Sequence, residues 1–226
     1  MTNDYLALWL TLKLAGLSTL ILLIISPFIA WWLSKSTSKI RPLAEALVAL
    51  PLVLPPTVLG FYLLLAFSPN YLPGQLWQSI TGSTLAFSFS GLLIGSIIYS
   101  LPFVVQPLQA GFSTLGNKEL EAAHTLGMSR WSKIKYIIVP MTKRSFLLAG
   151  VMGFAHTLGE FGVVLMIGGN IPGETQVLAI SLFEHVEAFE YEQAHKIAAG
   201  LLISSMTLLV VIYTFLQKKD VSRSTF

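Results

Sequence analysis

Two ionisable side chains, His156 and Glu160, lie four residues apart in the otherwise apolar stretch FAHTLGEFG. In a continuous helix this spacing places both on one face, where they can share a proton or brace neighbouring helices. Ionisable groups inside a membrane are costly and often belong to a transport pathway. A proton relay would need further acids or bases along its path, and the sequence offers few. We therefore favour a structural pair, with a titrating Glu160 as the alternative.

Other arrangements that support catalysis or metal binding are missing from the sequence. The chain has no cysteine, which excludes disulfides, thiolate nucleophiles and cysteine-based metal sites. It contains no GxxxxGK[ST] phosphate-binding loop, no GxSxG elbow and no HExxH zinc helix. His185 lies close in sequence to Glu184 and Glu187, but a solvated helix face explains this group better than a metal site. We predict no enzyme active site, no metal and no cofactor bound by this chain.

The composition indicates an integral membrane protein. Hydrophobic residues make up 54% of the 226 residues and charged residues 11%, and the mean hydropathy is +0.72. Soluble domains carry about 25% charged residues, so this chain would expose too much hydrocarbon in water. The formal charge of +3 is small, and no basic cluster indicates nucleic-acid binding. The first apolar run is too long for a signal peptide and lacks its basic n-region, so we expect it to be retained as a membrane span.

Five stretches are apolar and long enough to cross a bilayer, which takes about 20 residues. They cover residues 6–33, 43–67, 85–110, 144–168 and 196–216. A shorter apolar stretch near 175–189, within the loop 169–195, predicts an interfacial or re-entrant helix, or a sixth short membrane segment. The predicted fold class is an all-α polytopic membrane protein, with residues 1–226 forming a single transmembrane domain.

The basic residues predict the orientation, because Lys and Arg are retained on the cytoplasmic side of a membrane. Twelve of the 14 follow the first, third and fifth spans: Lys35, Lys39, Arg41, Lys118, Arg130, Lys133, Lys135, Lys143, Arg144, Lys218, Lys219 and Arg223. The intervening loops are uncharged (68–84) or acidic (169–195). This pattern places the N-terminus outside, the C-terminus in the cytoplasm, and residues 117–140 on the cytoplasmic side.

The cytoplasmic stretch ELEAAHTLGMSRWSKIKYIIVP, residues 119–140, has the pattern of two short amphipathic helices. Asn117 is a candidate N-cap for the first helix, and Gly127 suits the left-handed position that ends it. Ser129 is a candidate N-cap for the second helix, which we expect to end at Pro140. Such a pair can dock on another protein or lie on lipid headgroups, and periodicity does not decide between the two.

Prolines and glycines mark the spans as unusual helices. Pro51, Pro55 and Pro56 fall in the second span, where proline kinks a helix and frees a backbone carbonyl. The kink either packs statically or lines a pathway, and three prolines within six positions favour a pathway. Glycines such as Gly95 and Gly153 let helices approach closely, within one subunit or between subunits, and packing within the subunit is the simpler interpretation.

The residues Glu121-Ala122-Ala123, Gly127, Ile137 and Pro140 carry a spacing that resembles the EAA motif of ABC importer permeases. Only Val139 departs from the motif, which usually has leucine there. The stretches PLVLPPTVLGFYLL (51–64) and LGEFGVVLMIGGNIPGETQVLAISLFEHVE (158–187) resemble the molybdate permease subunits and their sulfate relatives. The resemblance extends over most of the chain and implies the fold of a type I ABC importer permease with a cytoplasmic coupling helix.

The resemblance also implies a function: translocation subunit of an ATP-driven molybdate importer in the bacterial inner membrane. A permease for sulfate, thiosulfate or tungstate is the alternative, and a proton-coupled carrier is a more distant one. The implied partners are a second copy of the chain, two ATP-binding subunits that hold ATP and Mg, and an external molybdate-binding protein.

Residue roles follow from the same resemblance. The EAA loop, 117–140, would couple to the ATPase through Glu121, Ala122, Ala123, Leu126, Gly127, Met128, Arg130, Trp131 and Pro140. The pore would need only weak polar contacts, for which the candidates are Pro55, Pro56, Thr57, Ser88, Ser90, Ser96 and Ser204. Glu160 is not expected in the path, because a bare carboxylate repels a dianion.

Overall fold

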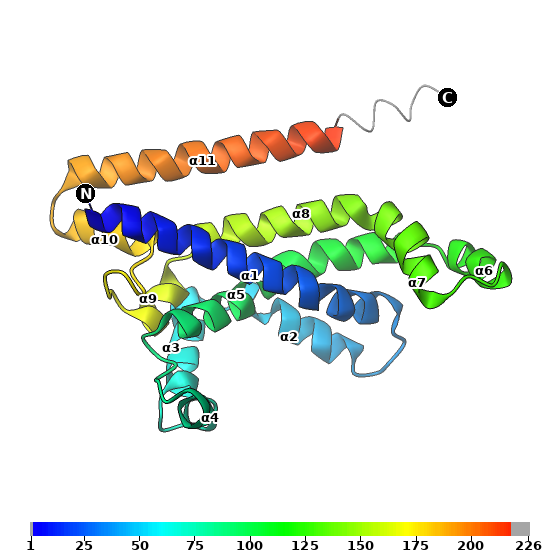
Figure 1. Ribbon diagram of the computed structural model, residues 1–226, viewed down its shortest axis with the longest axis horizontal. Helices are drawn as coiled ribbons and strands as arrows, with labels where there is room; N and C mark the ends of the chain where they lie inside the picture. Colours follow the sequence, from blue (N-terminus) through cyan, green and yellow to red (C-terminus); the bar gives the residue numbers. More distant parts are fainter. Residues whose placement is uncertain (1, 218–226) are drawn as a thin grey trace.

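A computed structural model describes residues 2–217 of the chain, with the side chains of residues 4–116, 121–212 and 214. Every regular element in this part is helical (Figure 1). Four of its helices are long and apolar enough to cross a membrane, and a bent pair makes a fifth span if it is counted as one. The predicted all-α membrane class is therefore confirmed.

Three long helices form the centre of the molecule: α1 (Thr2–Lys35), α5 (Phe89–Ser113) and α8 (Val139–Leu158). They pack against one another, with α8 running opposite to α1 and α5 (Figure 1). Glycines make the close approach possible, since a Cβ atom on Gly153 would lie 2.6 Å from a methyl of Val104 in α5. Gly150 similarly faces Leu23 of α1. These glycines serve packing within one chain, as in the simpler of the two interpretations.

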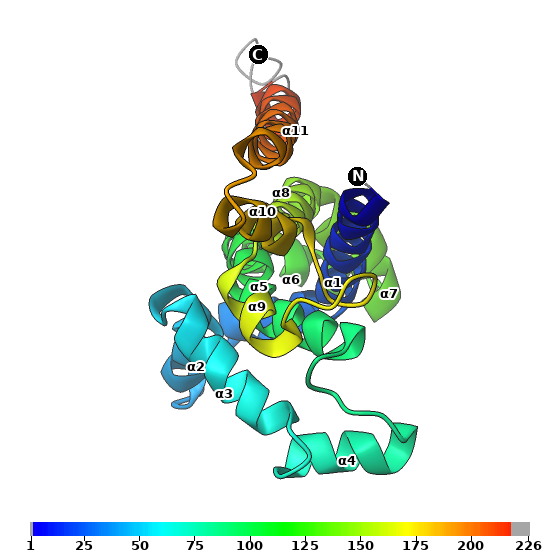
Figure 2. The ribbon, with the colours of Figure 1, turned by 90° about the vertical axis from the view of Figure 1, so that its left-hand side faces the viewer.

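The second predicted span is broken. It consists of α2 (Arg41–Val53) and α3 (Pro56–Phe67), whose axes differ by 112°. The break lies at Leu54, because the residue before a proline is pushed from helical to extended backbone and Leu54 has ψ 137°. The predicted proline interruption of the span 43–67 is present, but it breaks the helix into two rather than kinking it. α3 leads away from the bundle to α4 (Leu72–Thr81), a helix that we did not predict (Figure 2).

The fourth predicted span begins earlier and ends earlier than expected. One helical path runs from α7 (Arg130–Lys133) through the π-helical turn η1 (Ile134–Ile138) into α8. In the π turn the N–H of Val139 donates to the carbonyl of Ile134, five residues back, and this local shift accommodates Pro140 without ending the helix. The predicted end at Pro140 and the predicted start at 144 are both wrong. After Leu158 the chain breaks and resumes in the short helix α9 (Gly162–Gly168).

Two further helices complete the chain. α10 (Leu178–Glu187), with ten residues, is too short to cross a bilayer. α11 (Tyr191–Gln217) runs alongside the bundle and contacts α10 and, less extensively, α8. Only 6% of its most apolar 18-residue stretch is buried inside the molecule. α11 starts near α10, at the end of the molecule where α1 begins, and runs toward the end that carries α6 and α7 (Figure 1). Lys218, Lys219 and Arg223 of the charge pattern lie outside the described residues.

Candidate functional site

The first helix of the predicted EAA loop, α6 (Asn117–Thr125), ends in a defined backbone reversal. The N–H of Met128 donates to the carbonyl of Ala123, and the N–H of Gly127 donates to that of His124. This pair of bonds is the Schellman motif, and Gly127 adopts its left-handed conformation with φ +68°. The prediction for Gly127 is confirmed. Asn117 is the first helical residue and Gly116 holds the cap position, so the predicted Asn117 cap is wrong.

The second helix starts at once after this reversal. The Oγ of Ser129 accepts a hydrogen bond from the N–H of Ser132 at 3.2 Å, which confirms Ser129 as the N-cap of α7. Lys133 Nζ lies 3.4 Å from His124 Nδ1 and thereby links α7 to α6. The angle between the two helices is therefore held by a backbone motif, a cap and a side-chain contact.

The EAA loop presents most of its predicted coupling residues to the surroundings. Leu126 and Trp131 are each 80% exposed, although both are large and apolar. Ala123 is buried and Met128 is half-buried. The remaining predicted residues are exposed: Glu121, Ala122, Gly127, Arg130 and Pro140. An apolar surface of this kind is typical of a contact with another molecule.

The break between α2 and α3 meets the break between α8 and α9. A Cβ atom on Gly162, the first residue of α9, would lie 2.7 Å from the Cβ of Pro56. Further along, a Cβ on Gly60 would lie 2.7 Å from that of Met166. The predicted pore residues Pro55, Pro56 and Thr57 are exposed at this junction. α3 follows the break after α2, and α9 follows the break after α8. The close packing of α3 on α9 therefore connects the two breaks.

The predicted pore serines do not converge on one place. Ser88 is the N-cap of α5, where its Oγ accepts from the N–H of Gly91, and Ser90 is half-buried in the first turn. Ser96 is fully buried inside the bundle. Ser204 lies on α11, where it lines a groove of about 640 Å³ between α1 and α11. Within the predicted set, only sequence neighbours lie together among the described residues: Pro55, Pro56 and Thr57 at the start of α3, and Ser88 and Ser90 at the start of α5.

His156 belongs to a polar network that the sequence did not reveal. Its Nδ1 lies 2.9 Å from the Oγ of Ser100, and that hydroxyl lies 2.9 Å from the Oγ1 of Thr157. The ring stacks on Phe103 with centroids 3.7 Å apart, and Tyr99 lies beside it. The network extends to Ser18, so it joins α1, α5 and α8. The signal for Ser100 was its position four residues after Ser96 on the same helix face.

Glu160 does not contact His156 through a hydrogen bond. α8 ends at Leu158, so the two side chains do not share a continuous helix. The Glu160 residue is 4% exposed, and neither carboxyl oxygen has a hydrogen-bond partner among the described residues. The hydroxyl of Ser96 lies beside the carboxyl group, and its Oγ likewise lacks a partner. The pairing inferred from the i, i+4 spacing is not formed in this conformation.

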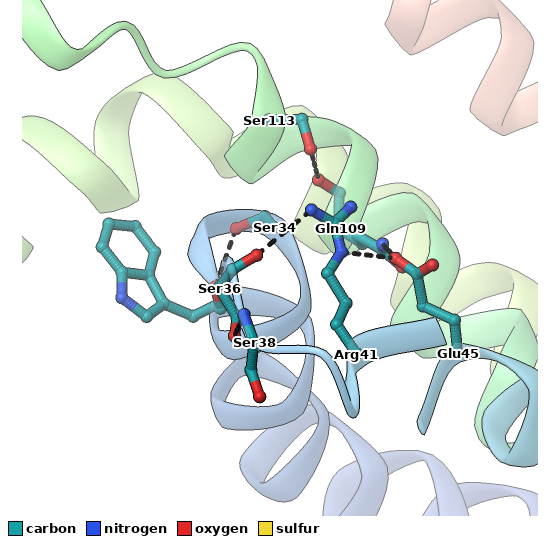
Figure 3. A network of polar contacts seen from close by, with 8 residues as sticks. Ser34, Ser36, Ser38, Arg41, Glu45, Gln109 and Ser113 are labelled. Atoms are coloured by element: carbon teal, nitrogen blue, oxygen red, sulfur yellow. Dashed lines mark hydrogen bonds and ion pairs between the residues drawn. The ribbon is translucent and has the colours of Figure 1, made fainter. Parts of the chain in front are cut away.

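A second unpredicted network lies at the end of the bundle that carries the loop between α1 and α2 (Figure 3). Arg41 Nε donates to Oε1 of Glu45 at 3.0 Å, and Gln109 Nε2 of α5 donates to the same oxygen at 2.8 Å. Arg41 also donates to the carbonyl of Ser36 at 3.3 Å. These contacts fasten the start of α2 to α5, so Arg41 has a structural role besides its contribution to the charge pattern.

At the opposite end, His185 joins α10 to the start of α1. Its Nε2 lies 3.1 Å from Oδ1 of Asp4, and its Nδ1 lies 2.7 Å from Oε2 of Glu190. These hydrogen bonds raise the pKa of His185 above its usual value. Glu184 instead accepts from Gln176 at 2.6 Å, so it takes no part in the His185 cluster. No group of three His, Asp or Glu side chains among the described residues is arranged to hold a metal ion.

Comparison with known sequences identifies relatives over almost the whole chain. Residues 23–221 match the family described as binding-protein-dependent transport system inner membrane component. The molybdenum transport system permease protein ModB of Azotobacter vinelandii is 50% identical over 212 residues, covering 94% of both chains. ModB of Escherichia coli (strain K12) is 32% identical, covering 92% of this chain and 90% of that protein. The sulfate transport system permease protein CysT of the same strain is 34% identical, covering 82% of this chain and 66% of that protein.

Comparison with solved structures shows a shared fold. A chain of a bacterial alginate ABC transporter, solved with an alginate pentasaccharide-bound periplasmic protein, has a TM-score of 0.73 at 18% identity, covering 95% of this chain and 78% of that one. A chain of the inward-facing MetNI methionine ABC transporter has a TM-score of 0.70 at 12% identity, covering 94% of each. The helical architecture, the match over residues 23–221 and the relatives together show that the chain belongs to the family of binding-protein-dependent transport system inner membrane components.

Proposed function

We propose that this chain is the membrane-spanning translocation subunit of an ATP-driven molybdate importer. The observation that carries the proposal is the 50% identity, over 94% of both chains, to a molybdenum transport system permease protein. The chain is a permease subunit without an ATP site, because its sequence has no phosphate-binding loop. ATP and Mg are bound by a separate subunit, and this chain binds no cofactor of its own.

In this proposal, residues 117–140 form the coupling element that docks on the ATP-binding subunit. The support is geometric: two short helices held at a fixed angle by Gly127 and Ser129 present Leu126 and Trp131 outward. The second of these helices continues without interruption to Leu158, beside the start of α1. A displacement at the docking surface is therefore carried along one helix into the membrane region.

The proposed assembly contains two copies of this chain in the type I importer arrangement, two ATP-binding subunits and an external molybdate-binding protein. The sparse packing of α11 against its own chain supports a second copy as its neighbour. The distribution of basic residues supports a bacterial inner-membrane protein with its N-terminus outside and its C-terminus in the cytoplasm. The exposed junction at Pro55, Pro56 and Thr57 is the proposed lining of the oxyanion path.

The test is reconstitution of the complete transporter in proteoliposomes. We expect molybdate, supplied with the binding protein, to stimulate ATP hydrolysis and to accumulate only when ATP is present. Dissipating the proton gradient should leave uptake unchanged. Uptake that needs the proton gradient and no ATP would establish a carrier instead. Competition by unlabelled sulfate, thiosulfate or tungstate separates the substrates, and a stronger response to sulfate would identify a sulfate permease.

The orientation has a separate test, because the chain lacks cysteine and any introduced cysteine is unique. We expect Lys133→Cys to resist a membrane-impermeant thiol reagent added to spheroplasts and to react after permeabilisation. Ser83→Cys, in the uncharged loop at the other end, should react in both. The reverse pattern would overturn the proposed topology.

A further inference from the structure

The interruption between α8 and α9 departs only slightly from a helix at its first residue. Gly159 has φ −95° and ψ 4°, and its N–H still donates to the carbonyl of Ala155 at 3.3 Å. The N–H of Glu160 reaches back to the carbonyl of Thr157 at 3.4 Å, and Phe161 has a clearly different backbone, φ −124° and ψ −56°. A change of torsion angles confined to this short segment would therefore extend α8 by about one turn.

Glu160 is poorly placed in the conformation described here. It is buried at the junction of α8 and α9, and both carboxyl oxygens lack hydrogen-bond partners, as does the neighbouring Ser96 hydroxyl. Native proteins leave few buried polar groups unsatisfied, and those that remain commonly have a functional explanation. This conformation therefore carries an unfavourable contribution that another conformation can remove.

His156 has the hydrogen-bonding capacity that Glu160 lacks. Only its Nδ1 is engaged in a hydrogen bond with a described residue, the Ser100 hydroxyl at 2.9 Å. Because Thr157 donates its hydroxyl proton to the carbonyl of Gly153 at 3.0 Å, the Ser100 hydroxyl donates to Thr157 and accepts from the Nδ1–H of His156. This leaves Nε2 as an acceptor for the O–H of a protonated Glu160 carboxyl. If α8 were extended through Glu160, the i, i+4 spacing would bring the two side chains together.

We infer that residues Gly159–Phe161 form a hinge of the transport cycle and that Glu160 is its positioning residue, unpaired in the described state and bonded to His156 in the other. The inference rests on the proposed function, because it assigns a moving part to the proposed transporter. The hinge lies at one end of the continuous helix 130–158, and the proposed ATPase-docking surface lies at the other end.

The contacts beyond the hinge indicate what its motion would change. α9 follows the hinge directly and packs on α3 through Gly162 against Pro56 and through Met166 against Gly60. Extending α8 would reorient α9, and this close fit would carry the change to the break between α2 and α3. Thr57 lies at that break and is exposed, so its accessibility is a direct reporter of the motion.

The experiment uses the complete transporter in proteoliposomes, with Thr57→Cys as the only cysteine in the permease. The rate of labelling by an impermeant maleimide is measured without nucleotide and after trapping with ATP and vanadate. In the Glu160→Leu background, which fills the site but cannot bond His156, we expect the nucleotide-dependent change in rate to fall about tenfold. Glu160→Gln retains a hydrogen-bond donor, its side-chain amide, and should remain within about twofold of the parent. Glu187→Leu, an exposed acid on α10, is the matched control and should have no effect.

A double-variant cycle separates pairing from a general structural role. His156→Leu should reduce the change in labelling as strongly as Glu160→Leu, and combining both should add nothing further, because one bond can be lost only once. Additive losses would contradict the inference, as would normal labelling changes in Glu160→Leu. Should Glu160→Leu fail to assemble, His156→Leu and Glu160→Gln still decide, since equal loss in both variants would overturn the pairing. A parent transporter that shows no molybdate-stimulated ATP hydrolysis would refute the proposed function instead.

Discussion

The two ends of the helix bundle are constructed differently. At the end that carries α10, polar side chains tie the elements to one another: Asp4 accepts from Ser181 at 2.8 Å and from His185, and Thr11 accepts from the N–H of Leu178 at 2.8 Å. At the end that carries α6 and α7, Leu126 and Trp131 remain exposed. The first end is tied together by hydrogen bonds to α10, whereas at the second end the Arg41–Glu45–Gln109 network holds α2 to α5 but Leu126 and Trp131 stay exposed for a partner to cover.

The difference indicates where the proposed transporter is rigid by itself and where it depends on assembly. Hydrogen bonds between α1 and α10 hold the first end whether or not a partner is bound. At the other end, the backbone motif and the N-cap fix the angle between α6 and α7. These two helices make few contacts with the helices of the bundle. Substitutions at the two ends should therefore fail in different assays, stability at the first and coupling at the second.

The largest effect is expected at Gly127. Gly127→Val places a β-branched residue at φ +68°, which costs about 1–2 kcal/mol and opposes the reversal between the two short helices. We expect the protein to insert normally, with molybdate-stimulated ATP hydrolysis of the reconstituted transporter reduced about tenfold or more. Gly127→Asn, which tolerates the left-handed conformation, should be much milder. Wild-type stimulation in Gly127→Val would show that the helix angle is irrelevant to coupling.

A somewhat smaller effect is expected at Trp131. Removing an exposed aromatic side chain from a docking surface costs about 1 kcal/mol of binding free energy, or roughly fivefold in affinity. Trp131→Ala should weaken co-purification of the ATP-binding subunit and leave the thermal stability of the isolated permease unchanged. Phe189→Ala, an equally exposed aromatic at the other end, is the control. Equal loss of the ATP-binding subunit in both variants would remove the distinction between the two ends.

The smallest effect concerns pH at the His185 cluster. Because Asp4 and Glu190 raise the pKa of His185, the protonated ring stabilises the folded state fully below the unfolded pKa of about 6.5. This contribution is lost as the pH rises through the higher folded value, and it amounts to about 1 kcal/mol or less. Hydrogen exchange of α10 amides, corrected for intrinsic rates, should show lower protection at pH 9 than at pH 6.

The control for this measurement is a second histidine. His185→Gln should abolish the pH dependence of α10 protection, while His195→Gln, exposed on α11, should retain it. A pH dependence of α10 protection that survives His185→Gln would show that another group causes it, and would contradict the role given to His185.

Local backbone signals predicted some features well and others poorly. Gly127 and Ser129 act through their own neighbouring residues, so their roles could be predicted from the sequence and are confirmed. Prolines were harder to interpret. At Leu54-Pro55-Pro56, two consecutive prolines follow Leu54 and the helix breaks. At Pro140, by contrast, a π turn accommodates the proline and the helix continues. The difference depends on how the preceding turn can rearrange, which a single residue type does not specify.

Long-range contacts were the least predictable. The contacts of Gln109 with Glu45 and of Ser100 with His156 could not be predicted, because each joins two helices and the sequence does not show which helices meet. The spacing of His156 and Glu160 predicted a shared face, and the helix end at Leu158 separates them in this conformation. Periodicity assumes a continuous helix, so it fails at breaks, where the proposed transporter has its pore lining and hinge.

The loose position of α11 has a consequence for biogenesis. Only 6% of the most apolar 18-residue stretch of α11 is buried, and such an exposed apolar helix would drive aggregation in water. In a membrane, lipid chains solvate this apolar surface as well as protein does. A newly inserted single copy can therefore wait in the bilayer with its last helix surrounded by lipid. Assembly then proceeds by exchanging those lipids for a neighbour, and the supply of permease need not be matched in time to that of its partners.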